Sequence, residues 1–165
     1  MISIKSAAIN DLEVIQELAY EIWPFAYGEI LSAPQLKYML EKFYSLSSLV
    51  DQATILKHQF IMVLENEKPV GFASYSSHND DQNIFHLNKI YVLPQQQGKN
   101  IGKKTLDYII TQIKNSGATS LQLNVNRNNN ALHFYEKEGF KIIREEDIDI
   151  GEGYFMNDYV MEKKW

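Results

Sequence analysis

One stretch of the sequence constrains the fold more than any other, because its hydrophobic period changes within a few residues. From Ile84 to Leu93 apolar and polar residues alternate, which is typical of a β-strand. The next residues form a loop that contains Gly98 and Gly102, and from Ile101 onward apolar residues recur at helical spacing. A strand that passes through a short glycine loop directly into a helix is typical of a mixed α/β fold.

Further periodic segments surround this stretch. Runs with a period of two predict strands at residues 2–4, 58–65, 69–76, 83–93, 120–126, 140–146 and 154–163. Helical spacing predicts helices at residues 10–23, 32–43, 49–56, 101–116 and 128–139. We expect the first helix to begin at a capping box of Asn10 and Glu13 and to stop before Pro24, and Ser32 with Gln35 repeats the capping pattern.

Length and composition exclude several classes of protein. The chain has 165 residues, and we expect residues 1–165 to form a single domain. It contains no cysteine, which excludes disulfides, thiolate metal sites and cysteine nucleophiles. The net charge of −5 argues against nucleic acid as a partner, since phosphate contacts need a basic face. No signal peptide or apolar run of membrane-spanning length is found, so we expect a soluble, cytoplasmic protein with no membrane partner. Three histidines, His58, His78 and His133, lack ligand spacing, and no metal site is expected.

The glycine loop is suited to hold an anion. The first turn of a helix presents unpaired N–H groups and a partial positive charge, and small residues let a ligand approach the backbone. Lys99, Lys103 and Lys104 add positive charge there, so a phosphate or pyrophosphate is the natural ligand. The spacing fits neither a Walker A loop nor a Rossmann loop. Taken alone, the segment is equally compatible with a plain strand–helix connector.

Two motifs resemble those of the GNAT superfamily of acyl-CoA-dependent N-acyltransferases. The run Gln97 to Gly102 resembles its Q/R-x-x-G-x-G/A signature, with Asn100 where the family usually has a glycine. Asparagine is the non-glycine residue that best tolerates a positive φ, so the turn can be kept. The run Asn128 to Phe140 resembles the second family motif, N-x-x-A-x-x-x-Y-x-K-x-G-F. The matching positions are Asn128, Ala131, Tyr135, Lys137, Gly139 and Phe140.

The resemblance implies a fold, a cofactor and the residues that bind it. The implied fold is α/β, with a central mixed, mostly antiparallel sheet of about seven strands, flanked by helices and splayed between strands 4 and 5. The implied cofactor is acetyl-CoA or coenzyme A, whose pantetheine arm pairs with exposed main chain while the pyrophosphate rests on the loop N–H groups. The residues expected to bind it are Ile90, Tyr91, Val92, Gln97, Gly98, Lys99, Asn100, Ile101, Gly102, Lys103, Asn124, Asn128 and Lys137.

The resemblance also implies direct acyl transfer within a ternary complex. It assigns protonation of the leaving thiolate to Tyr135, and a backbone N–H near Val92 is expected to stabilise the oxyanion. Strand alternation places His86 and Asn88 on one face and Phe85, Leu87 and Lys89 on the other. We expect His86, or a water held by Asn88, to take the proton of the amine. Glu29 and Asp158 are further candidates, and His86 is equally compatible with a packed sheet histidine.

The acceptor is expected to be a primary amine on a small molecule. Residues 23–34 are expected to form an aromatic loop that, with the C-terminal hairpin, lines the acceptor pocket. The candidate wall residues are Trp23, Tyr27, Glu29, Tyr154 and Tyr159. An aromatic, acidic pocket suits a cationic amine, and the chain is loosely similar to the polyamine-acetylating branch of the superfamily. A peptide N-terminus, an amino sugar and a catalytically silent acyl-CoA-binding sensor remain alternatives, and a homodimer is left open.

Overall fold

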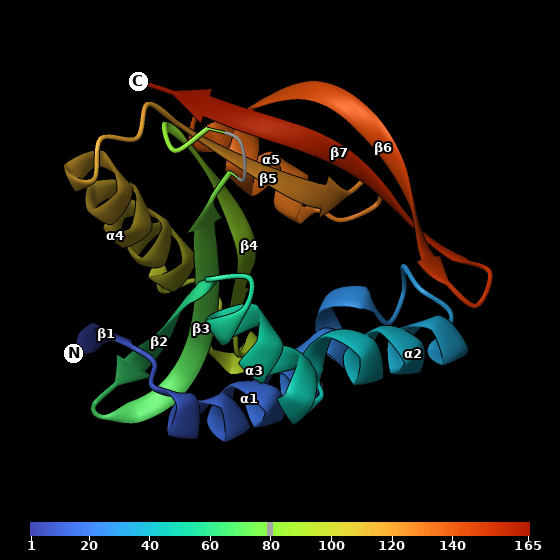
Figure 1. The fold of residues 1–165 in the computed structure, drawn as a ribbon. Helices are drawn as coiled ribbons and strands as arrows, with labels where there is room; N and C mark the ends of the chain where they lie inside the picture. Colours follow the sequence, from blue (N-terminus) through green and yellow to red (C-terminus); the bar gives the residue numbers. More distant parts are fainter. Residues whose placement is uncertain (79–80) are drawn as a thin grey trace. The chain divides into compact units, whose positions relative to one another are not determined.

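The computed structural model describes residues 1–78 and 81–165 and contains the predicted strands and helices in the predicted order (Figure 1). The strands are β1 (Ile2–Ser6), β2 (Gln59–Glu65), β3 (Lys68–Ser77), β4 (Ile84–Val92), β5 (Ser120–Asn126), β6 (Lys141–Gly151) and β7 (Tyr154–Lys164). The helices are η1 (Ile9–Asp11), α1 (Leu12–Tyr27), α2 (Ala33–Tyr44), α3 (Leu46–Thr54), η2 (Pro94–Gln96), α4 (Ile101–Asn115) and α5 (Ala131–Lys137).

The strands form one mixed sheet in the order β1-β2-β3-β4-β5-β7-β6. The pairs β1–β2, β2–β3, β5–β7 and β6–β7 are antiparallel, whereas β4 and β5 are parallel. The parallel ladder runs from Ile84–Ser120 to Leu87–Leu123, while β4 continues to Val92 and β5 to Asn126. This arrangement confirms the predicted mixed, mostly antiparallel sheet.

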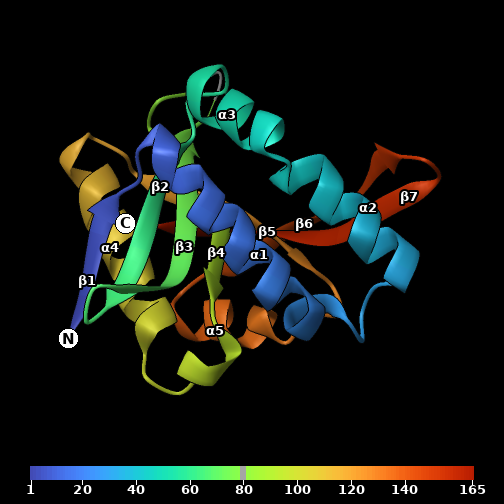
Figure 2. The same cartoon turned by 90° about the horizontal axis from the view of Figure 1, so that it is seen from below.

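The chain divides into two compact units, and the boundaries between them fall within β3, β4 and α4. The first unit comprises Met1–Ser76 and Asn88–Ile109, and the second comprises Ser77–Leu87 and Ile110–Trp165. In the first unit α1 and α3 lie on one face of the sheet, and the beginning of α4 lies on the opposite face (Figures 1 and 2). Its core contains the fully buried side chains Ile15, Tyr44, Leu49, Phe72, Ile101 and Leu106.

The second unit is built on the antiparallel strands β5, β7 and β6, with α5 connecting β5 to β6. Its buried side chains include Ile113, Leu121, Leu123, Phe140 and Met161. In β5 the apolar residues alternate with Gln122 and Asn124, so two amide side chains project from one face of this strand.

The N-terminal helix differs from its prediction at both ends. Asn10 is not its cap: a short 3₁₀ turn comes first, in which the Asp11 carboxylate accepts a hydrogen bond from the Ala8 N–H at 2.8 Å. Pro24 does not end the helix either, because α1 continues to Tyr27. A proline in the last turn removes only the hydrogen bond to the carbonyl of Tyr20, an exposed residue, so water can replace it. The Ser32 cap is confirmed, since its hydroxyl accepts from the Gln35 N–H at 3.2 Å.

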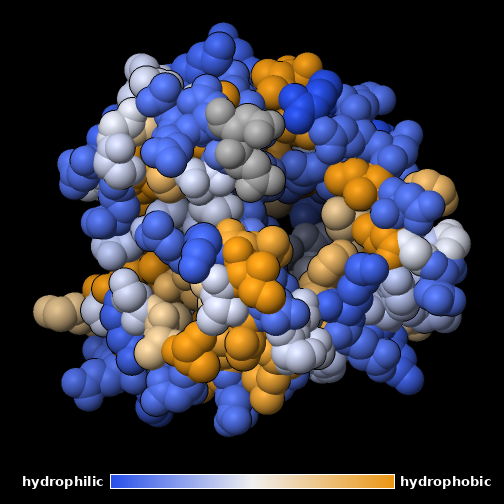
Figure 3. All heavy atoms as spheres, in the orientation of Figure 1, coloured by the Kyte–Doolittle hydropathy of each residue, from blue (hydrophilic) through white to orange (hydrophobic). Residues whose placement is uncertain are grey.

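Large apolar side chains are exposed at scattered positions in the described chain, among them Phe25, Ile55, Leu56 and Phe155. On the face shown in Figure 3, apolar groups are interspersed with polar ones. Among residues 1–78 and 81–165 no helix is both long enough and apolar enough to span a membrane.

Candidate active site

The glycine loop adopts the conformation expected from its sequence. Gly98 has φ +84° and Asn100 has φ +59°, both in the left-handed region. Asn100 therefore takes the role that a glycine usually has in the family signature, as predicted. Its carbonyl accepts from the Lys104 N–H at 3.0 Å, which starts α4, and Ile101 is buried. A Cβ at Gly98 would meet no atom within 4 Å, so the loop leaves open space beside the backbone.

The lysines of the loop are paired with acidic side chains of the same unit. Lys99 Nζ lies 3.4 Å from a Glu65 carboxylate oxygen and donates to the Gln96 side-chain oxygen at 2.9 Å. Lys103 Nζ lies 3.1 Å from the Asp107 carboxylate. These side chains are about half exposed. The two lysines are thus held at the start of α4 by surface ion pairs that are individually weak.

The end of β4, which we expected to pair with pantetheine, lies tightly against β3. A Cβ at Gly71 would stand 2.7 Å from the Tyr91 carbonyl oxygen and 3.4 Å from Val92 Cα. The Leu93 N–H donates to the Val70 carbonyl at 2.8 Å. Only a glycine at position 71 permits this approach, so the backbone of Tyr91 and Val92 is fixed from the β3 side.

An aromatic cluster joins α1 and α2 to the sheet in the first unit. The Tyr27 and Tyr91 hydroxyl oxygens are 2.8 Å apart, and the Trp23 ring packs against Tyr27, Tyr44 and Tyr91. Trp23 is 4% exposed, so it is a core residue, whereas Tyr27 is partly exposed and Glu29 is exposed. Burial, with a smaller contribution from Tyr27, raises the pKa of the Tyr44 hydroxyl well above its usual value. Trp23 and Tyr27, which were predicted to lie in a loop, thus belong to helix α1.

Lys89 was not predicted as a site residue and lies within this aromatic region. Its ammonium is 5.3 Å from the Tyr44 ring centre and 5.9 Å from that of Phe60. Burial lowers the pKa of Lys89 to about 8. The strand pattern gave no signal for this, since a lysine in a strand is normally expected to reach solvent.

The predicted alternation along β4 fails between Asn88 and Lys89. The Asn88 amide donates to the Ser76 hydroxyl at 3.0 Å, and Ser76 lies on the face of β3 that also carries Phe72. Phe72 packs edge-on against Tyr44, the ring beneath Lys89. Neighbouring residues 88 and 89 therefore reach the same face, which a regular strand does not allow.

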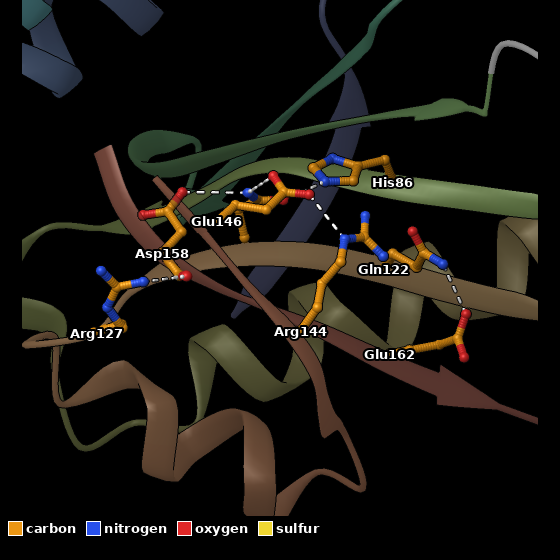
Figure 4. A network of polar contacts seen from close by, with 8 residues as sticks. His86, Gln122, Arg127, Arg144, Glu146, Asp158 and Glu162 are labelled. Carbon is orange, nitrogen blue, oxygen red and sulfur yellow. Dashed lines mark hydrogen bonds and ion pairs between the residues drawn. The ribbon is translucent and has the colours of Figure 1, made fainter. Parts of the chain in front are cut away.

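His86, Asn124 and two carboxylates form a network in the second unit (Figure 4). His86 Nε2 lies 3.1 Å from Asn124 Oδ1, and Asn124 Nδ2 lies 3.3 Å from Asp158 Oδ2 and 3.5 Å from Glu146 Oε2. Asp158 is 5% exposed. Burial raises the pKa of Asp158, an effect to which Glu146 adds and against which the Asn124 hydrogen bond and Arg127 act. His86 is thus part of a polar network, and sequence reasoning had not linked it to Asn124.

The second sequence motif forms α5 and the turns on either side of it. Tyr135 is 8% exposed, and its ring contacts Phe134 and Phe140. Asn128 and Lys137 are exposed at the two ends of this segment. Tyr154 and Tyr159 are partly exposed on β7. In the part of the chain that the structure describes, no group of three or more metal-ligating side chains is present.

A comparison with known protein families shows the family of the chain. A model of the acetyltransferase (GNAT) family matches residues 13–140. The chain belongs to the GNAT family of acetyltransferases. It is 30% identical to the spermidine N(1)-acetyltransferase of Thermoplasma acidophilum over 99% of this chain and 98% of that protein. It is 34% identical to the ribosomal protein bS18 alanine N-acetyltransferase of Haemophilus influenzae, over 58% of this chain and 60% of that protein.

A solved structure shares the same fold over its whole length. The PaiA N-acetyltransferase of Thermoplasma acidophilum, crystallised in complex with coenzyme A, superposes with a TM-score of 0.83 at 29% identity. The match covers 100% of this chain and 99% of that one. These comparisons confirm the predicted superfamily, its fold, the acyltransferase class and the likeness to the polyamine branch.

Proposed function

We propose that this GNAT acetyltransferase transfers the acetyl group of acetyl-CoA to a primary amine of a polyamine-like small molecule. The observation that carries the proposal is the loop before α4, where Gly98 and Asn100 both adopt positive φ and the helix starts at once. A helix start with open space beside its backbone suits a diphosphate. The protein of known structure that is similar over the full length binds coenzyme A.

The residues of the loop and of β4 fit the cofactor. The N–H groups of Gln97 to Lys103 are suited to the pyrophosphate, and Lys99 and Lys103 supply positive charge. The main chain of Ile90, Tyr91 and Val92 would pair with the pantetheine arm, and Asn128 and Lys137 stay predicted cofactor residues. The side chain of Asn124, also predicted to bind the cofactor, is engaged by His86, Glu146 and Asp158. When bound, acetyl-CoA supplies an activated acetyl thioester.

The protein's own groups move two protons. The Tyr135 hydroxyl donates a proton to the leaving sulfur, for which a neutral phenol is suited. His86 accepts the proton that the acceptor ammonium must lose before its nitrogen has a lone pair. The alternative base is a water held by Asn88, whose amide is anchored on Ser76. No covalent intermediate on the protein is needed, in accordance with the absence of cysteine.

A cationic amine is the acceptor class that the side chains favour. Tyr27 at the end of α1 and Glu29 just beyond it offer an aromatic face and a negative charge to a cationic amine. Tyr154 and Tyr159 on β7 stay predicted acceptor residues. The similarity to a spermidine N(1)-acetyltransferase over 99% of the chain points the same way. The similarity to an alanine N-acetyltransferase favours a second candidate, the N-terminus of a protein, but covers only 58% of the chain.

The remaining features agree with a single catalytic domain. The family model spans residues 13–140 and so includes parts of both compact units, which we therefore assign to one N-acetyltransferase domain of residues 1–165. We expect it to act in the cytoplasm on a small-molecule amine, without nucleic acid or membrane as a partner.

An amine panel tests the acceptor class. Release of thiol from acetyl-CoA is followed with spermidine, glucosamine, a peptide with N-terminal alanine, and an N-blocked lysine peptide. We expect kcat/KM for spermidine to exceed kcat/KM for every other amine by at least about tenfold. We expect Glu29→Gln to lower kcat/KM for spermidine by a larger factor than kcat/KM for glucosamine. A preference for the alanine peptide would overturn the small-molecule proposal in favour of the second candidate. Coenzyme A binding without turnover of any amine would support a silent sensor instead.

A further inference from the structure

The side chain of Asn124 connects a histidine on β4 to carboxylates on two other strands (Figure 4). Its oxygen lies 3.1 Å from His86 Nε2, and its nitrogen lies 3.3 Å from Asp158 Oδ2 on β7 and 3.5 Å from Glu146 Oε2 on β6. All four residues belong to the same compact unit. The network therefore lies within one compact unit.

The directions of these hydrogen bonds follow from the chemistry of the groups. An ionised carboxylate only accepts hydrogen bonds, so the NH₂ of Asn124 must face Asp158 and Glu146. Its carbonyl oxygen then faces His86, and a carbonyl oxygen only accepts. His86 Nε2 must therefore carry the hydrogen, and in the neutral ring the lone pair is on Nδ1. A neutral amide cannot pass a proton along the chain, so Asn124 holds the ring and does not relay protons.

Charged side chains of both signs surround Asn124. Asp158 is nearly fully buried, and Glu146 approaches the same amide nitrogen from β6. The positive groups are Arg127, which contacts the Asp158 carbonyl oxygen and the carboxylates of Glu145 and Asp147, and Arg144, which pairs with Glu146. Glu162 on β7 is engaged by Gln122. Burial raises the pKa of Asp158, so keeping this carboxylate ionised costs folding free energy at neutral pH.

We propose that Asn124 is a positioning residue for His86, holding the ring with hydrogen on Nε2 so that Nδ1 accepts the proton of the acceptor ammonium, and that the Asp158 carboxylate supports the resulting imidazolium through the amide. This rests on the proposed acetyl transfer. The proton leaves the ammonium nitrogen and its bonding pair stays there as the lone pair of the amine. The same proton forms an N–H bond at Nδ1, and the imidazolium returns it to water after the transfer. The step moves no proton to or from Asp158.

The kinetic test compares two amides of the same strand. Asn124→Leu removes the link to His86, and Gln122→Leu is the matched control because Gln122 is also a β5 amide bound to a β7 carboxylate, Glu162. We expect Asn124→Leu to lower kcat by at least about tenfold, and to move the acidic limb of the kcat–pH profile. We expect Gln122→Leu to change neither quantity more than about twofold. Equal effects of the two variants, or an unchanged pH profile in Asn124→Leu, would overturn the proposal.

Asp158→Asn keeps the hydrogen bond and removes only the charge, so it tests the carboxylate even if Asn124→Leu does not fold. We expect Asp158→Asn to have a lower kcat and a KM for acetyl-CoA within about twofold of the wild-type value. We also expect its unfolding at neutral pH to require at least as much urea as unfolding of the wild type. An unchanged kcat contradicts the role of Asp158.

A spectroscopic measurement separates this inference from the proposed function, because it needs no turnover. In ¹⁵N-labelled protein near pH 8, two-bond ¹⁵N–¹H spectra identify the protonated nitrogen of His86, assigned by loss of the signals in His86→Gln. We expect hydrogen on Nε2 in the wild type, and a loss of that preference or of the slowly exchanging Nε2–H in Asn124→Leu. Hydrogen on Nδ1 in the wild type overturns the positioning role. If this signature is found but no amine is acetylated, the proposed function fails and the Asn124–His86 interaction stands.

Discussion

The burial of Lys89 over the Tyr44 ring leads to a quantitative prediction about stability. Lys89 is a partly buried cation between Tyr44 and Phe60, and burial lowers its pKa from 10.5 to about 8. In the unfolded chain the same group keeps a pKa near its ordinary value. Folding at neutral pH therefore moves the charged Lys89 ammonium out of water. The ammonium holds its proton less tightly in the folded state than in the unfolded chain.

The size of the effect follows from the two pKa values. At about 1.4 kcal/mol per pH unit, the gap between 10.5 and about 8 amounts to about 3 kcal/mol of lost stability at pH 7. Because the pKa of Lys89 is lower in the folded protein, its charged form destabilises the fold. This loss of stability is largest below pH 8, declines as the pH rises and is absent above pH 10.5. By the same relation it is about 2 kcal/mol at pH 9 and below about 1 kcal/mol at pH 10. Contact of the ammonium with two rings offsets part of it.

Lys89→Met removes the charge and keeps the length of the side chain. We expect this variant to be more stable than the wild type by up to about 3 kcal/mol at pH 7, and the difference to shrink toward zero by pH 10. Urea unfolding of both proteins at pH 7, 8, 9 and 10 measures it. Lys42→Met is the matched control, because Lys42 also lies over a tyrosine ring but is exposed. A Lys89→Met variant no more stable than the wild type at pH 7, or an advantage that does not change with pH, refutes the reasoning.

Three further predictions concern the cofactor loop and its support. Glu65→Gln releases Lys99 from its ion pair, so we expect coenzyme A to bind about twofold to fivefold tighter by calorimetry, with no change in Glu41→Gln; weaker or equal binding contradicts this. Asn100→Ala should lower the free energy of unfolding by about 1 kcal/mol because of φ +59°, and Asn100→Gly should not; equal stabilities contradict the left-handed turn. Gly71→Ala should destabilise the fold by about 1–3 kcal/mol, because its Cβ would meet the Tyr91 carbonyl; unfolding at the wild-type urea concentration contradicts this close approach.

Local features were predictable from the sequence where one residue type has few alternatives. Asn100 could be assigned a left-handed conformation because asparagine adopts it more readily than most residues other than glycine, and Ser32 could be assigned as a cap. Pro24 misled the prediction because proline was taken as a helix end. At that position its missing N–H affects a carbonyl near solvent, so the helix continues.

Contacts between distant residues could not be predicted from local patterns. The aromatic cluster joins Trp23, Tyr44, Phe72 and Tyr91, which lie on different elements and carry no shared signal in the sequence. The link from Asn124 to its carboxylates depends on β7 and β6 following β5 in the sheet.

The alternation along β4 breaks between Asn88 and Lys89. The sequence places two polar residues side by side there, but this alone does not show that both side chains reach the same face. The family resemblance supplied the fold and the cofactor. The supporting contacts required the structure.

The most direct test of acetyl transfer compares the wild type with Tyr135→Phe, using acetyl-CoA and spermidine. Phenylalanine keeps the ring contacts with Phe134 and Phe140 and removes only the hydroxyl. We predict that the wild type forms one acetylated spermidine for each thiol released. We predict that Tyr135→Phe binds coenzyme A equally well by calorimetry, while its kcat falls at least about 100-fold. A wild type that binds no coenzyme A, or a Tyr135→Phe variant as active as the wild type, would contradict the account.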